Sequence, residues 1–356
     1  MTSEAALHGA PGAGQALAER GLSPGHCATW RANRSNLTQC ILGGLFAVWA
    51  ATAAIAAQAA CPGPAVALQP MGGGVWWAAG ADGDADTANR GVVSNRLVVR
   101  DGARVWLLGS GPSPAAGAAL ACALRERLQW RVTDVVNPWA RPELVLGNLA
   151  FPAARLWAHA EVASAMRDSC ARCEARLRLR LGAAAADLGD ASIRVPARLL
   201  QGAAGHLGPF DWWRLSRAPG SPVVVFRIRG RDLWTAHGLL WGDGPPDLRD
   251  ADLSTLRSAT AQLEALAGGG EARWLPEQGG WLGRSGPRDH GAYLQALTEA
   301  VRRRQATGAS ETDAAPALPG LAEAMGRGAR PALNWQRAWR QLEDESFGPS
   351  TPASAP

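Results

Sequence analysis

The sequence of 356 residues contains no lysine, one tyrosine and four methionines, so its formal net charge of +5 rests on arginine alone. The arginines are scattered along the chain, and no basic run is interleaved with aromatic residues as a nucleic-acid groove requires. We therefore expect no nucleic-acid partner. The apolar fraction of 47% is ample for the core of a packed globular body.

Several motifs of common enzymes are absent as well. No Gly-x-Ser-x-Gly elbow occurs, which leaves serine hydrolysis without a supporting motif. The glycine-rich stretches at 72–77 and 109–117 do not match a phosphate-binding spacing. No repeat of fixed short period appears. Two strand-rich halves separated by a helical segment instead favour a two-sheet sandwich.

One long stretch, LTQCILGGLFAVWAATAAIAAQAAC at 37–61, has no charged residue and follows Arg31 and Arg34. Its positive flank, apolar centre and Ala-Gln-Ala end predict a signal peptide over 37–59 that is cleaved before Ala60, and hence a periplasmic or otherwise exported protein. The stretch is also long enough to span a bilayer, so an uncleaved inner-membrane anchor is the alternative. In either case membrane contact is expected only through this segment. Residues 1–36 are predicted to form a disordered extension.

The six cysteines divide into two groups: Cys27, Cys40 and Cys61 leave with the signal or lie beside it, while Cys122, Cys170 and Cys173 remain in the body. In an oxidising compartment, Cys170 and Cys173 are predicted to form a short-range disulfide at the start of a helix. The alternative is a CxxC redox site, although no thioredoxin-like strand precedes it. A zinc knuckle would need a second ligand pair, and none is visible.

The rest of the chain alternates between strand-like and helical segments. Two apolar, β-branched runs on either side of Asp101 and Gly102 predict a hairpin. Ser113 and Pro114 predict the start of a helix through their N-cap and first-turn preferences. Further helices are expected at 254–266, 290–308 and 332–347, and the tail 348–356 is expected to be disordered.

Five blocks resemble, in order and spacing, a known family. They are VWLLGSGPS, DVVNPWARPELVLGN, PPDLRDADLSTLRSATAQLEAL, RWLPEQGG and LNWQRAWRQLE. The chain resembles the metallo-β-lactamase-fold hydrolases, and more narrowly their exported quinoprotein relay system zinc metallohydrolase-like branch. The resemblance implies an α+β fold over residues 72–347: a four-layer αββα sandwich of two mixed β-sheets flanked by helices.

The same resemblance indicates the loss of the family's zinc ligands. The family loop reads Asn-Thr-His-x-His-x-Asp-His-Val-x-Gly-Asn, and its Val-x-Gly-Asn ending matches residues 145–148. This alignment places Trp139 and Arg141 at the first two histidines, Glu143 at the aspartate and Leu144 at the third histidine. Gly238 matches the bridging aspartate and Gln278 the last histidine. The intervening histidine falls within 217–222, and no His, Asp, Glu or Cys occurs from 215 to 231.

The residues at the matched zinc-ligand positions allow two interpretations. In the first, the new side chains fill the old site and Arg141 neutralises Glu143. In the second, Trp139 and Arg141 line a pocket for a planar or anionic ligand, together with Trp76, Trp77 and Trp212. Three other histidines carry weak signals: we interpret His159 as structural, His206 as a turn residue and His290 as a cap or solvent-exposed residue.

The leading hypothesis is an exported pseudoenzyme without a cofactor that binds a partner or ligand. The family branch implies an association with a periplasmic quinoprotein dehydrogenase or a cytochrome. The alternative is a divergent zinc-dependent hydrolase with a rearranged site made of Glu143, His237, Asp243 and Asp247. Its motivation is that Asp243 and Asp247 follow the strand end that carries the family's bridging ligand. A membrane-anchored structural protein is a third possibility.

Overall fold

The computed structural model describes residues 61–190 and 193–347, which belong to one compact unit. The predicted extension 1–36, the predicted signal segment 37–59 and the tail 348–356 lie outside the described residues. The ordered body begins before Gly72, because the first strand starts at Leu68 and a disulfide involves Cys61. Within residues 61–190 and 193–347, no helix is both long and apolar enough to cross a membrane.

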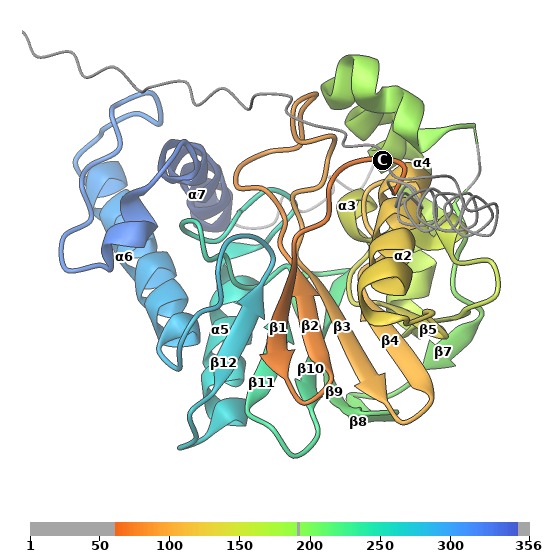
Figure 1. Cartoon of the computed structure of the whole chain (residues 1–356). Helices are drawn as coiled ribbons and strands as arrows, with labels where there is room; N and C mark the ends of the chain where they lie inside the picture. The colour runs from red at the N-terminus through yellow and green to blue at the C-terminus, as the bar shows by residue number, and fades with distance from the viewer. Residues whose placement is uncertain (1–60, 191–192, 348–356) are drawn as a thin grey trace, which may run out of the picture. The chain divides into compact units, whose positions relative to one another are not determined.

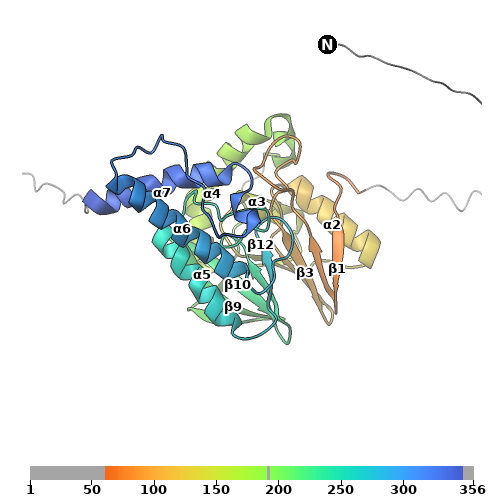
Figure 2. The same ribbon diagram turned by 90° about the vertical axis from the view of Figure 1, so that its left-hand side faces the viewer.

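The strands form two mixed sheets that face one another (Figures 1 and 2). The first sheet runs in chain order: β1 (Leu68–Gly72), β2 (Val75–Ala78), β3 (Arg96–Asp101), β4 (Arg104–Leu108), β5 (Asp134–Asn137), β6 (Arg155–His159) and β7 (Arg198–Leu200). Its strands are antiparallel up to β4 and parallel from β4 onward. The second sheet has the order β12 (Arg273–Pro276), β11 (Leu233–Ala236), β10 (Ser221–Ile228), β9 (Phe210–Ala218) and β8 (Ala204–Leu207), and its β11–β12 pair is parallel.

In the described part of the chain, six α-helices surround the two sheets. They are α2 (Pro114–Leu128), α3 (Pro142–Val145), α4 (Ala160–Leu181), α5 (Leu253–Ala267), α6 (Gly286–Ala306) and α7 (Arg330–Phe347), with 3-10 turns η1 (Leu146–Ala150), η2 (Gly182–Leu188) and η3 (Glu323–Gly326). Helix α2 packs on the first sheet, while α5, α6 and α7 form the layer outside the second (Figure 2). The predicted αββα sandwich is confirmed.

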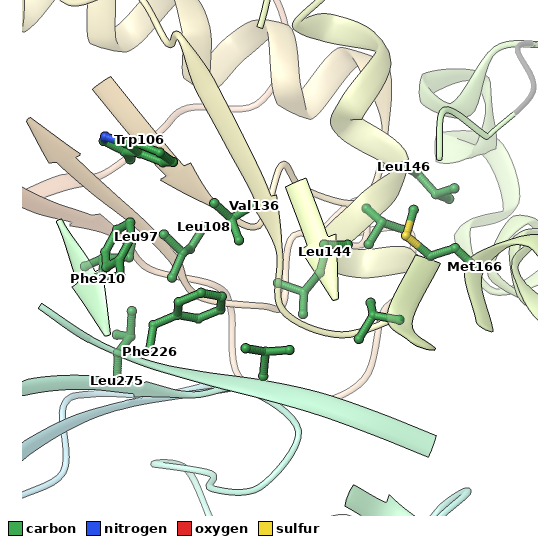
Figure 3. Packing of buried hydrophobic residues seen from close by; sticks show 14 of the residues in the cluster. Leu97, Trp106, Leu108, Val136, Leu144, Leu146, Met166, Phe210, Phe226 and Leu275 are labelled. Carbon is green, nitrogen blue, oxygen red and sulfur yellow. The ribbon is translucent and has the colours of Figure 1, made fainter. Parts of the chain in front are cut away.

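The main core lies between the two sheets, where alternate side chains of each strand point inward. In β3, Leu97 faces this core and Val98 faces α2 instead. Figure 3 shows the inter-sheet packing, in which Phe210 and Phe226 of the second sheet approach Leu97 of the first. The buried face of α4, including Met166, extends the same core at one end. These contacts position the ends of the strands, where the predicted site residues lie.

Local signals in the sequence explain two of these elements. Gly102 has a φ of +57°, the left-handed conformation that the tight β3–β4 turn requires. Ser113 begins α2, because its Oγ accepts a hydrogen bond from the Ala116 N–H at 3.1 Å. The predicted hairpin and the predicted helix start are therefore confirmed.

The predicted Cys170–Cys173 disulfide is wrong, since both are free thiols in the middle of α4 rather than at its start. Cys170 is buried in the inter-sheet core, whereas Cys173 lines a cavity on another face of the helix. Because the two thiols lie on different faces of a regular helix, a disulfide between them would require the backbone to move. Burial raises the pKa of the Cys170 thiol to about 12, which also removes the thiolate that a redox motif needs at neutral pH.

The disulfide joins Cys61 to Cys122 instead, across a sequence separation of 61 residues. It fastens the segment before β1 to α2, with the two Cα atoms 5.6 Å apart. No spacing pattern indicates such a long-range pair, because connectivity between distant cysteines is decided by the fold.

Candidate functional site

The loop that follows β5 keeps the frame expected from the sequence. Asn137 and Asn148 exchange side-chain hydrogen bonds, with N···O distances of 3.1 and 2.7 Å, and both are fully buried. The Asn148 amide also donates to the Arg194 carbonyl at 2.9 Å. Pro142 opens α3, where its fixed φ suits the first helical turn. The reciprocal amide pair thus closes the loop at its base and fixes where its central residues point.

Trp139 occupies the space beside Gly238, the position matched to the family's bridging aspartate. A Cβ atom on Gly238 would lie 3.0 Å from the indole ring and 3.1 Å from Val223. Gly238 also has a φ of +77°, which disfavours any other residue. The indole therefore fills the volume that a carboxylate would need, and these two predicted site residues do converge.

Arg217 supplies a buried cation next to this indole. Its guanidinium lies 4.3 Å from the Trp139 ring and 5.3 Å from the Trp241 ring, and the residue has no exposed surface. It donates hydrogen bonds to the carbonyls of Gly238, Asp247 and Arg249 at 2.9, 2.7 and 3.1 Å. Burial lowers the pKa of Arg217 to about 10, and the Asp247 carboxylate opposes that shift. Arg217 thereby ties three chain segments to one point.

Arg141 forms a second, largely buried cation, and its guanidinium lies 5.2 Å from the centre of the Trp139 ring. Its Nε donates to the Glu143 carboxylate at 3.1 Å and lies 3.7 Å from that of Glu277, which is fully buried. Burial alone would lower the pKa of Arg141, but Glu143 and Glu277 raise it above its usual value. The predicted Arg141–Glu143 pair is confirmed. With Arg217, the buried cluster holds two cations and two carboxylates, so its charges balance.

His237 lies near Glu277, but its ring is hydrogen-bonded to the backbone and does not form part of a set of metal ligands. Its Nε2 is 2.8 Å from the Asn95 carbonyl, so that nitrogen donates, and its buried Nδ1 has no partner among the described residues. Burial lowers the pKa of His237, although Glu277 opposes the shift, and the imidazole is neutral at pH 7. Ser94 hydrogen-bonds the Glu277 carboxylate.

The other predicted site residues belong to separate contacts. Gln278 donates to the Gly83 carbonyl at 2.8 Å and accepts from Arg330 at 2.7 Å. Asp243 pairs with the same Arg330 at 2.6 Å. Leu144 is fully buried in the inter-sheet core (Figure 3). Gln278 and Leu144 thus do not join the Trp139 cluster.

Asp247, the last residue of the proposed rearranged site, pairs with Arg249 at 2.7 Å. Each acid of that site is held by its own arginine, and His237 is bonded to backbone. Across residues 61–190 and 193–347, no group of three or more His, Cys, Asp and Glu side chains is placed to hold a metal ion.

The cluster around Trp139 does not fit zinc. Zinc binds neutral imidazole, thiolate or carboxylate. Trp139 and Gly238 offer none of these, and the Glu143 and Glu277 carboxylates are already paired with Arg141. Two guanidinium groups, Arg141 and Arg217, would also repel a divalent cation. No reaction step through a metal is derived for this site.

A cavity of about 850 Å³ opens beside the cluster. It is bounded by residues 139–143, one face of α4, the β9–β10 turn, the loop 247–252 and two side chains of α7. Trp139 and Arg141 line it, as the pocket interpretation of the sequence expects, and Glu143 lines it as well. The expectation for Trp77 and Trp212 is wrong, because both are buried in the inter-sheet core. Trp76 instead packs against Trp130 beside α2.

The weakly marked histidines have structural contacts. His159 contacts the Gly202 carbonyl at 3.0 Å, and His206 lies 2.6 Å from the Asp211 carboxylate. The interpretation of His290 as a cap or solvent-exposed residue is wrong. It is fully buried inside α6, accepts from the Trp241 N–H at 2.9 Å and donates to the Gly286 carbonyl at 2.8 Å.

Arg217 and Glu277 complete the cluster, and no motif singles either of them out. Arg217 lies at the end of β9 and Glu277 directly follows β12. Their positions in the sequence could have indicated them, since both fall in or beside turns that carry zinc ligands in the family that the chain resembles. Neither residue matches a histidine or an aspartate of the family pattern, so the pattern did not select them.

Comparison with known proteins agrees with this architecture. No family model and no curated protein sequence matches the chain. Several solved structures are similar to the chain. One is the metallo-β-lactamase FIM-1 from Pseudomonas aeruginosa in its mono-zinc form, which matches with a TM-score of 0.53 and 15% sequence identity. The match covers 66% of this chain and 96% of that chain. The chain has the metallo-β-lactamase fold. A metallo-β-lactamase from Hirschia baltica is similar, with a TM-score of 0.51, 14% identity, and 65% and 98% coverage.

The structure from Pontibacter korlensis agrees equally, with a TM-score of 0.51, 15% identity, and 65% and 99% coverage. At such identities the likeness establishes the fold alone. The chemistry of this metallo-β-lactamase-fold chain must therefore be argued from its own residues.

Proposed function

We propose that this chain is an exported, non-catalytic binding protein of the metallo-β-lactamase fold that is associated with periplasmic quinoprotein dehydrogenase systems. The observation that carries the loss of catalysis is the packing of Trp139 against Gly238 with the Arg217 guanidinium on its ring. An indole and a buried cation stand where zinc chemistry would need carboxylate and imidazole. The charge-balanced cluster stabilises the loops without a metal.

Two features support export. The disulfide between Cys61 and Cys122 is of the kind that persists in oxidising compartments. The predicted cleavage before Ala60 would leave Cys61 as the second residue of the mature chain, free to form this bond. An uncleaved anchor is distinguished by the mature N-terminus, which mass spectrometry of the purified protein identifies.

The partner follows from the resemblance to the quinoprotein relay branch. A periplasmic quinoprotein dehydrogenase or its cytochrome is therefore the expected partner. Binding is tested by titrating each purified candidate against the immobilised mature protein. Saturable binding supports the association, and a signal no greater than that of an unrelated periplasmic protein rules out that candidate.

Loss of catalysis is tested on protein exported and purified in its mature form. After incubation with excess zinc and dialysis, elemental analysis is expected to find far less than one zinc per chain. Hydrolysis of a lactam, an ester and a thioester is expected to equal the buffer rate. An active zinc metallo-β-lactamase treated in parallel is the control. Stoichiometric zinc together with hydrolysis would contradict the proposal.

The rearranged hydrolase is separated from this proposal by two substitutions. If any hydrolysis is found, Glu143→Ala and His237→Ala should abolish it under the rearranged-site hypothesis. Full activity and unchanged metal content in both variants would dismiss that hypothesis.

A further inference from the structure

The cavity beside Trp139 has one wall built from a single face of α4. Ala165, Ser169, Cys173, Arg176 and Arg180 line it at intervals of three or four residues, the spacing that aligns side chains along one side of a helix. Residues of α7 and the loop 247–252 face this wall from the other elements that bound the cavity. The cavity volume of about 850 Å³ lies within the range of small-molecule sites.

Several charged groups around the cavity are already paired. Arg141 is held by Glu143 and Glu277. Arg249 contacts both Asp247 and Asp84. These groups form parts of the wall, and two arginines among four carboxylates carry a net negative charge. Any attraction for an anion must therefore come from arginines outside these pairs.

The remaining charges favour an anion. Arg176, Arg180 and Arg337 have no carboxylate within ion-pair distance in the part of the chain that the structure describes, and Arg176 contacts only the Cys173 sulfur at 3.2 Å. Asp252 is occupied as the cap of α5, where it accepts from the Thr255 N–H. Asp250 is the one lining carboxylate without a hydrogen bond among the described residues, so three unpaired guanidinium groups face one unpaired acid.

We propose that this cavity binds a small planar organic anion that carries two or more carboxylates. Guanidinium groups recognise carboxylates through paired, charge-assisted hydrogen bonds. Arg176 and Arg180 lie one helical turn apart, which suits two separate carboxylates on one ligand. Trp139 and Leu177 add apolar surface for a planar body. The inference rests on the proposed function only in treating the cavity as a site for binding rather than hydrolysis.

The test is calorimetric titration of the mature protein at low salt with benzene-1,3,5-tricarboxylate. Binding is expected, with benzoate at least about tenfold weaker because it offers one carboxylate to three arginines. Cyclohexane-1,3,5-tricarboxylate keeps the charges without the planar ring and should bind about threefold more weakly. Equal affinity for benzoate and the tricarboxylate, or no binding of the tricarboxylate at millimolar concentration, overturns the inference.

Variants locate the site. Arg176→Gln and Arg337→Gln should each weaken tricarboxylate binding about fivefold, which is a modest loss because these side chains are partly solvated. Arg167→Gln removes the same charge from an exposed position of α4 outside the cavity and should change affinity less than about twofold. Equal effects of all three substitutions would place the ligand elsewhere and overturn the site.

The two proposals fail separately. Tricarboxylate binding by a protein that also takes up zinc and hydrolyses a lactam contradicts the proposed function and leaves this site standing. A metal-free, inactive protein that binds no tricarboxylate refutes the ligand class and leaves the loss of catalysis standing.

Discussion

Replacing the buried guanidinium of Arg217 with an apolar side chain should destabilise the fold. Arg217→Met keeps the length of the side chain but leaves the carbonyls of Gly238, Asp247 and Arg249 without their donor. An unpaired buried carbonyl costs about 2 kcal/mol, so the three together cost about 6 kcal/mol. The pKa of Arg217 is lowered to about 10, which corresponds to an unfavourable burial of charge of about 3 kcal/mol. Methionine removes that penalty.

The net loss of unfolding free energy is therefore about 3 kcal/mol. Urea denaturation followed by tryptophan fluorescence measures it through the midpoint, provided the slope is unchanged. Arg284→Met, at an exposed position without an ion pair among the described residues, is the matched control and should change stability by less than about 0.5 kcal/mol. If Arg217→Met is as stable as the wild type, the guanidinium does not hold these segments together.

Three further outcomes are expected. Gly238→Asp restores a zinc-ligand type but should destabilise the fold by about 3 kcal/mol without zinc uptake. The reason is that its Cβ would lie against Trp139 and that the φ of this position is +77°. Gly238→Ala should show most of the same loss of stability in thermal unfolding. Burial lowers the pKa of His290 to about 4, so its contribution to stability is complete above about pH 6.5 and is lost as the pH falls toward 4. His290→Gln should flatten the pH dependence of the urea midpoint in that window. Cys122→Ser should cost about 4 kcal/mol, the entropy of closing a 61-residue loop, and reduction of the wild type should reproduce it.

Each of these outcomes has a clear contradiction. Stoichiometric zinc in Gly238→Asp would mean that the Trp139 side chain moves and leaves room for a metal ion. Parallel pH profiles for wild type and His290→Gln would mean that other groups dominate acid unfolding. A Cys122→Ser variant as stable as the oxidised wild type would mean that the segment before β1 is held by packing alone.

Much of the fold was predictable because its signals are local. Asp101 and Gly102 specify a tight turn, and Ser113 supplies the first hydrogen bond of α2, so neither depends on distant residues. The order of five short blocks then indicated the sandwich without any single decisive motif. The loop frame at Asn137 and Asn148 was equally recognisable.

The site was only partly predictable, for a physical reason. Trp139, Arg141, Glu143 and Gly238 were recognised by position, yet Arg217 and Glu277 come from the ends of other strands and meet them only in three dimensions. Gln278 was selected where its neighbour Glu277 faces the cluster, because a shift of one residue at a strand end reverses the direction of a side chain.

The sequence by itself determined the two-sheet architecture and the loss of histidine from every matched ligand position, since both follow from residue identity and order. The tertiary structure alone decided which cysteines pair, because a disulfide needs proximity and the sequence records only spacing. It alone also decided which arginines are neutralised. Arg141 and Arg217 are enclosed by partners, whereas Arg176 faces a cavity without a carboxylate partner among the described residues, and burial with pairing depends on contacts between distant segments.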